Sequence, residues 1–275
     1  MTATTASPAA SAARPVRWFI ADTATVTARE LLHWRNRPGV MAFGWFFPVM
    51  IMLIFVGLLG GAIGAPAGAS YLDFVMPGVL AMTMFFGLEG TMTAMLADVS
   101  SGITDRFRSL PMSGAAVIAG RCVADLLNSL VGLTLVAATG LLLGWRPDAP
   151  VHAAAAALGL LILLRIAMLW IGAYLGLRVR NQEAVNAIQV LVWPLLFLSS
   201  VFVDTATMPS WLGVIADANP LSQTVTAVRG LLGEQAGGGA SWFADNASAL
   251  AIVVPIALTA VFLPLAARRW RRLSR

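Results

Sequence analysis

Long apolar runs separated by short polar or charged segments dominate this chain of 275 residues. Because an α-helix rises about 1.5 Å per residue, roughly 20 consecutive apolar residues cross the hydrocarbon layer of a bilayer. Six runs reach about this length, at residues 41–63, 74–96, 115–143, 153–177, 185–203 and 247–266. The pattern predicts an all-α integral membrane protein in which residues 38–272 form one domain with six transmembrane helices.

The segment before the first run predicts an additional helix that does not cross the membrane. Residues 16–37 mix Trp and charged side chains with a moderate apolar stripe that includes Val16, Phe19 and Val26. Such a helix is suited to lie at the membrane interface, and the alternative is an ordinary positively charged flank. Residues 1–15 are rich in Ala, Thr, Ser and Pro, so we expect a disordered tail there.

The connection at residues 204–245 predicts two short helices. Asn219 is a good N-cap, Pro220 suits the first helical position and Gly233 suits a C-terminal stop. Apolar residues recur between them at helical spacing, at Leu221, Val225, Val228 and Leu232. With a preceding helix at 210–218, this connection is expected to form a re-entrant hairpin on the outer side, which would bury the stripe.

The distribution of arginines predicts the orientation in the membrane. The chain has 18 basic residues, all of them Arg. Fourteen lie before the first run, after the sixth, or in the connections on the same side as the termini, and Arg121 lies just inside the third run on that side. Arg146 and Arg229 lie on the opposite side, and Arg165 lies deep inside the fourth run. The positive-inside rule then places both termini in the cytoplasm. We expect the membrane to be the plasma membrane. Because these arginines gather at span ends, we expect lipid headgroups and no nucleic acid as their partners.

The sequence does not contain the residues that nucleotide binding, metal binding or hydrolysis would require. A P-loop needs a Lys that reaches the phosphates, and the sequence contains none. Cys122 is the only cysteine, the two histidines have no neighbouring ligand types, and no hydrolase motif occurs. We therefore expect no catalytic residues, metal site or cofactor on this chain, and any ATP would be hydrolysed by another polypeptide.

Two ionisable residues fall deep within the runs. Glu89 lies in the second and Arg165 near the middle of the fourth, where each costs roughly 2.5–3.5 kcal/mol on insertion scales. Their similar depth favours an ion pair between them if the two helices are neighbours. The alternatives are a polar point on a substrate route and a proton-relay carboxylate. Arg121 and Asp125, four residues apart, are expected to form a local ion pair.

The connection at residues 98–113 carries the best candidate for a docking contact. Pro111 should stop a short helix there. Before it, an aromatic ring is surrounded by charges of both signs, in the order Asp105, Arg106, Phe107 and Arg108. An aromatic anchor within a charged rim is typical of protein–protein contacts.

Three segments together resemble a known family. GITDRFRSLPMSGAAVIAGR (102–121), MPGVLAM (76–82) and NPLSQTVTAVRGLL (219–232) are similar to segments of ABC-2 type export permeases, especially the daunorubicin-resistance branch. The resemblance implies a six-span half with an elbow helix, a cytoplasmic coupling helix and an outer re-entrant hairpin. It also implies that two halves pair, and that two ATPase subunits binding ATP and Mg²⁺ drive export. Gly114 departs from the family, where many relatives carry a basic residue.

The sequence therefore predicts the permease subunit of an ATP-driven exporter of a hydrophobic or amphiphilic substrate, such as a drug, an antibiotic or a lipid. Asp105, Arg106, Phe107, Arg108 and Pro111 would couple it to the ATPase. The alternative is a self-contained, ion-coupled secondary transporter that uses Glu89 or Arg165.

Overall fold

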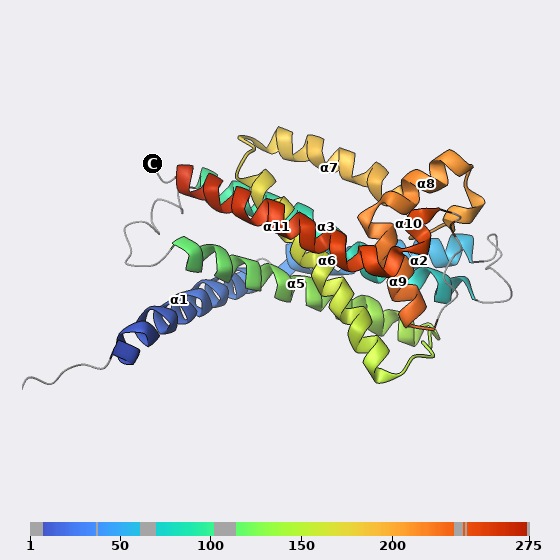
Figure 1. Cartoon of the computed structure of the whole chain (residues 1–275), viewed down its shortest axis with the longest axis horizontal. Coiled ribbons are helices and arrows are strands. Elements are labelled where there is room, and N and C mark those ends of the chain that lie inside the picture. The colour runs from blue at the N-terminus through green and yellow to red at the C-terminus, as the bar shows by residue number, and fades with distance from the viewer. Residues whose placement is uncertain are drawn as a thin grey trace, which may run out of the picture.

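The structure is a computed structural model that describes residues 8–36, 38–60, 70–101, 114–233, 239 and 241–273, and its long elements are α-helices (Figure 1). In chain order they are α1 (Pro8–Asn36), α2 (Pro38–Leu59), α3 (Tyr71–Ser100), α5 (Gly114–Leu142), α6 (Val151–Gly176) and α7 (Gln182–Phe197). The short 3-10 helix η2 (Thr205–Thr207), then α8 (Ser210–Ala218), α9 (Pro220–Leu231), α10 (Trp242–Asp245) and α11 (Ala247–Leu273) complete the fold.

Within the described part of the chain, five helices are long and apolar enough to cross a membrane, namely α2, α3, α5, α6 and α11. The fifth predicted run behaves differently, because α7 ends at Phe197 and has 16 residues, about 24 Å of helix. Pro194 lies inside α7, where it lacks an N–H and crowds the preceding turn. The Ser199 hydroxyl then donates to the Leu196 carbonyl at 2.5 Å, so the chain turns where the sequence predicted continuous helix.

The bundle has two ends, which we name by their contents. The arginine end holds the C-terminal ends of α3, α6 and α11 together with the start of α5. The hairpin end holds α8, α9 and α10, and it lies at the opposite end of α11 (Figure 1).

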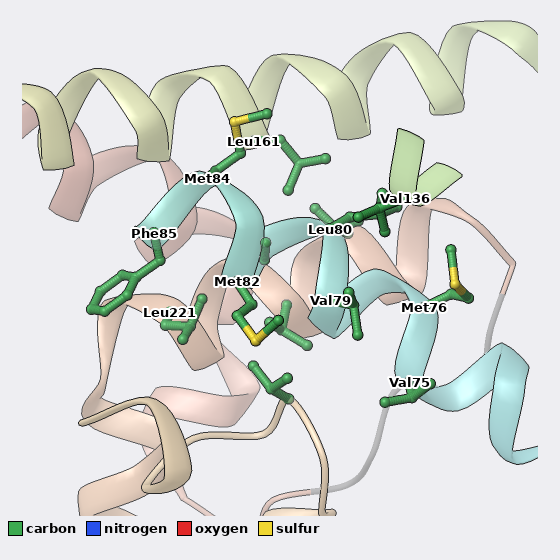
Figure 2. Close-up of a cluster of buried hydrophobic side chains, with 14 of the residues drawn as sticks. Val75, Met76, Val79, Leu80, Met82, Met84, Phe85, Val136, Leu161 and Leu221 are labelled. Atoms are coloured by element: carbon green, nitrogen blue, oxygen red, sulfur yellow. The ribbon is translucent and has the colours of Figure 1, made fainter. Parts of the chain in front are cut away.

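Helix α3 forms the centre of the bundle. In an apolar stretch of 18 residues within α3, 83% of the residues are buried, against 17% in the corresponding stretches of α2 and α11. Methionines fill much of this core, and Met76, Met82, Met84 and Met92 are all 0% exposed. Figure 2 shows Met76, Met82 and Met84 among aliphatic side chains of α3, α5, α6 and α9. The flexible thioether side chain suits such irregular spaces between helices.

Helix α6 lies against α3 because glycines remove side chains from the contact. A Cβ at Gly172 would lie 2.5 Å from the Leu88 carbonyl oxygen, and one at Gly176 would lie 2.5 Å from that of Met92. The two glycines are four residues apart, so they lie on one face of α6 and let the backbones approach closely. This contact fixes which face of α3 is turned toward α6.

Helix α1 begins at Pro8, earlier than the predicted start at residue 16, because the alanine-rich residues that follow favour a helix. It packs on the first turns of α5, where the Thr27 hydroxyl donates to the Gly120 carbonyl at 3.0 Å. A Cβ at Gly120 would lie 2.7 Å from the Thr23 carbonyl oxygen, so the glycine permits this approach. Trp18 on the same helix is 69% exposed, which leaves an apolar side chain available to a membrane interface.

Candidate functional site

A single guanidinium joins three helices at the arginine end. Nη1 of Arg121 on α5 lies 2.6 Å from Oδ2 of Asp98 on α3 and 3.3 Å from Oε2 of Glu30 on α1. Its Nε lies 3.9 Å from Oδ1 of Asp125, one turn further along α5. The predicted Arg121–Asp125 pair is confirmed, but it is the longest of the three contacts. We call Arg121 with these three carboxylates the arginine-end ion cluster.

The ion cluster flanks the segment that the sequence singled out for docking. Asp98 precedes residues 102–113 in the last turn of α3, and Arg121 follows them in the second turn of α5. The short ion pair between them holds together the two helix ends that border this segment. The predicted coupling residues themselves lie outside the described part of the chain, namely Asp105, Arg106, Phe107, Arg108 and Pro111.

The buried Arg165 forms a second polar node, in the middle of α6. Its side chain is 1% exposed; Nε donates to the Ser129 hydroxyl of α5 at 2.7 Å and Nη2 to the Thr91 hydroxyl of α3 at 3.0 Å. Gly87 of α3 makes room, because a Cβ there would collide with the guanidinium. Nη1 has no hydrogen-bond partner among the residues described.

The predicted Glu89–Arg165 ion pair is not formed in this structure, although α3 and α6 are neighbours as the prediction required. The reason is the rotation of α3. Gly87 and Thr91 meet the guanidinium, and a residue two positions from either is turned by about 200° around the helix. Glu89 therefore lies on the opposite face, and Arg165 bonds to hydroxyls instead.

Glu89 faces the side of α3 that carries α7. One turn before it, the Phe86 ring lies 5.1 Å from the Trp193 ring of α7 and 6.0 Å from the Phe47 ring of α2, measured between centroids. About one turn after it, Met92 packs with Val185 of α7. Oε1 of Glu89 is buried and has no hydrogen-bond partner within the described ranges.

The local signals in the connection at the hairpin end are confirmed. The Asn219 side chain accepts from the Leu221 N–H at 3.0 Å, and Pro220 occupies the first turn of α9. Asn219 also donates to the carbonyls of Leu195 and Leu198, which ties the hairpin to the end of α7. Gly233 follows with a φ of 79°, a left-handed conformation that favours glycine.

Sequence reasoning missed the role of Arg229, which it counted only as an arginine of the outer connection. The side chain is 0% exposed and donates to the Phe74 carbonyl at 2.9 and 3.1 Å and to the Ser200 carbonyl at 3.0 Å. Its Cζ also lies 4.0 Å from the centroid of the Phe74 ring. The sequence did contain one indication that Arg229 is buried, because it lies four residues after Val225 on the apolar face of α9.

Comparison with known proteins places these features in a family. The family model described as ABC-2 type transporter matches residues 22–232, which include both polar nodes and helices α8 and α9. The chain is 36% identical over 260 residues to the "Daunorubicin resistance ABC transporter permease protein DrrB1" of Streptomyces coeruleorubidus, covering 94% of this chain and 89% of the relative. It is 22% identical over 214 residues to the "Probable doxorubicin resistance ABC transporter permease protein DrrC" of Mycobacterium tuberculosis, covering 78% of each. The apolar helices, the polar nodes and these matches together show that the chain belongs to the ABC-2 type transporter family, in its daunorubicin-resistance permease branch.

Proposed function

We propose that this chain, the permease subunit of an ABC exporter, is driven by a separate ATPase subunit that binds ATP and Mg²⁺, and that it pairs with a second permease half. The observation that carries the proposal is the 36% identity, over 94% of the chain, to a protein named as an ABC transporter permease. The absence of Lys from the sequence supports it, because a P-loop requires one.

The proposed topology has six crossings, with α7 as the fifth. Helix α6 ends at the arginine end, and the Asn219 side chain joins the hairpin to the Leu195 carbonyl of α7. Since α7 begins after α6 and finishes beside the hairpin, it connects the two ends of the bundle. The 16 residues of α7 are fewer than an ordinary span, so residues 198–203 would complete the crossing.

The arginine end is proposed to face the cytoplasm at the plasma membrane, because positive side chains favour that side. In a Cys122→Ala background, Ser101→Cys should be labelled by an impermeant thiol reagent only from inside. Thr207→Cys, at the hairpin end, should be labelled from outside intact cells. The opposite pattern would reverse the orientation.

The segment at residues 102–113 is the proposed contact with the ATPase. In this proposal Phe107 is the anchor, charged residues surround it, and Pro111 ends a short coupling helix; the charged residues are Asp105, Arg106 and Arg108. The ion cluster at the base of the segment supports a mechanical role, since Arg121 links Asp98 of α3 with Glu30 of α1. A displacement of the segment would then move α3, α5 and α1 together. ATP binding can shift the permease only if the ATPase contacts differ between its two conformations.

The experiment that tests this coupling is a pull-down of the ATPase combined with transport in vesicles, at matched permease abundance. Phe107→Ala should weaken ATPase capture, because truncating an interface anchor typically costs about 2 kcal/mol or more. Phe43→Ala is the matched control, since that ring is 68% exposed on α2 and has no role in the proposed contact. Normal capture and transport by the Phe107→Ala/Arg106→Ala double variant would remove this segment from the mechanism.

The proposed substrate is a hydrophobic or amphiphilic molecule such as a drug, an antibiotic or a lipid. Two relatives are named for resistance to daunorubicin and doxorubicin. Large apolar side chains are exposed along α2 and α7, including Phe46 at 57%, Val190 at 68% and Leu191 at 68%. These faces are available to lipid, to substrate or to the second permease half.

A further inference from the structure

Glu89 of α3 carries a carboxyl group in the membrane region whose role the fold does not explain. Its Oε1 is buried without a hydrogen-bond partner in the described part of the chain, although a buried polar atom without a partner is costly. Arg165, the predicted partner, is engaged by Ser129 and Thr91 on the other side of α3. Arg229 is held by the carbonyls of Phe74 and Ser200.

One turn of α3 before Glu89, Phe86 packs with two further aromatic rings. Phe47, Phe86 and Trp193 come from α2, α3 and α7, and each ring lies within 6.0 Å of the other two, measured between centroids. We call these three residues the aromatic cluster. Aromatic faces attract organic cations through their quadrupole, and the attraction strengthens when water is excluded.

The surface of α3 is open one position beyond Glu89. A Cβ placed on Gly90, the next residue, would meet nothing within 4 Å, although most of α3 is tightly enclosed. Helix α7 covers this side of α3 through contacts on either side of Glu89, with Trp193 against Phe86 and Val185 against Met92. In Figure 1, α7 lies on the outside of the bundle.

We propose that Glu89 and the aromatic cluster bind an organic cation between α3 and α7, with the carboxylate facing the positive charge and the rings holding the apolar part. The inference rests on the proposed export of amphiphiles and narrows the substrate to those that carry a positive charge. A carboxylate in a partly dry site attracts a cation more strongly than it would in water. An anionic amphiphile would not be attracted by the carboxylate, and a neutral amphiphile would be stabilised only by the apolar contact with the rings.

The test uses two lipophilic ions of nearly equal size and opposite charge, tetraphenylphosphonium and tetraphenylborate. Binding of each is measured to the full permease, assembled with its ATPase and held in lipid nanodiscs. The wild-type protein should prefer the phosphonium, and Glu89→Gln should weaken phosphonium binding about tenfold or more while leaving borate binding unchanged. Glu183→Gln, at the exposed start of α7, is the matched control and should behave as the wild type. An equal preference in wild type and Glu89→Gln, or no preference in wild type, would overturn the proposal.

A second measurement needs no variant and covers the case in which Glu89→Gln fails to fold. Dicyclohexylcarbodiimide modifies carboxyl groups in apolar surroundings, and mass spectrometry can follow the modification at Glu89. Tetraphenylphosphonium should slow this modification about tenfold, and tetraphenylborate should not. If neither ion binds and Glu89 is inaccessible to the reagent, the second permease half covers this face and the ligand site is wrong. If ATP-dependent export and ATPase capture are then normal, the proposed function still holds. If export and capture are both absent, the proposed function is wrong as well.

Discussion

The arrangement around Arg165 leads to an unusual prediction, in which removing the charge is tolerated better than removing one of its neutral partners. The Ser129 hydroxyl accepts from Arg165 Nε while donating to the Asp125 carbonyl of its own helix at 3.1 Å. The Thr91 hydroxyl likewise accepts from Arg165 Nη2 while donating to the Gly87 carbonyl at 3.0 Å. In Arg165→Met both hydroxyls therefore keep their donated hydrogen bonds.

The two substitutions should change the free energy of unfolding by different amounts. Ser129→Ala leaves a charged donor unsatisfied at a side chain that is 1% exposed, and such a loss typically costs about 1–3 kcal/mol. Arg165→Met replaces a buried charge by an apolar side chain of similar length, and because both hydroxyls keep their donated hydrogen bonds this change should be close to neutral. The Ser129→Ala/Arg165→Met double variant should resemble Arg165→Met, because the unsatisfied donor is gone.

Heating the purified permease in detergent and measuring the folded fraction by size-exclusion chromatography tests this order. About 2–4 °C of midpoint shift is expected for each kcal/mol in a chain of this size class. Thr134→Ala is the matched control on α5, since its exposed hydroxyl bonds only to the Leu130 carbonyl of the same helix, and it should shift the midpoint little. If Arg165→Met lowers the midpoint more than Ser129→Ala does, the guanidinium has a structural partner that this account lacks.

Three further predictions follow from the close contacts. Arg229→Ala should lower stability by about 2–4 kcal/mol in the same assay, because the carbonyls and ring that it bridges lose their partner; Arg229→Lys with full stability would contradict this. Gly172→Ala should lower the unfolding midpoint because its Cβ would lie 2.5 Å from a carbonyl oxygen of α3. Gly159→Ala on the same helix is the control, since its Cβ meets nothing within 4 Å, and it should be neutral or stabilising. Equal shifts of the midpoint in the two variants would refute the contact. Arg121→Ala should reduce transport per ATP hydrolysed, and the charge exchange Arg121→Asp/Asp98→Arg should restore part of it if their ion pair transmits motion; unchanged coupling in Arg121→Ala would show that it does not.

The features that the sequence predicted well are set by residues that are adjacent in the sequence. The cap of α9 needs only Asn219 and Pro220, which are adjacent, and the stop at Gly233 needs only a residue that tolerates positive φ. Runs of apolar residues likewise identified α2, α3, α5, α6 and α11 without knowledge of their packing.

What the sequence missed depends on how helices are turned toward one another. The Glu89–Arg165 pair failed because glycine contacts between α6 and α3 set the rotation of α3, and hydropathy does not record rotation. The acceptors of Arg229 are backbone carbonyls 155 and 29 residues away, which no side-chain pattern identifies. The early end of α7 could have been predicted only by giving Pro194 more importance than the continuous apolar run around it.

Whether a separate ATPase drives this permease can be measured by transport into inverted vesicles that contain the chain with or without the ATPase. Uptake of an amphiphile should occur only when the ATPase and hydrolysable ATP are both present, and it should be inhibited by vanadate but unaffected by collapse of the ion gradients. Uptake by this chain alone, driven by an ion gradient and abolished by Glu89→Gln, would instead identify the chain as an ion-coupled transporter.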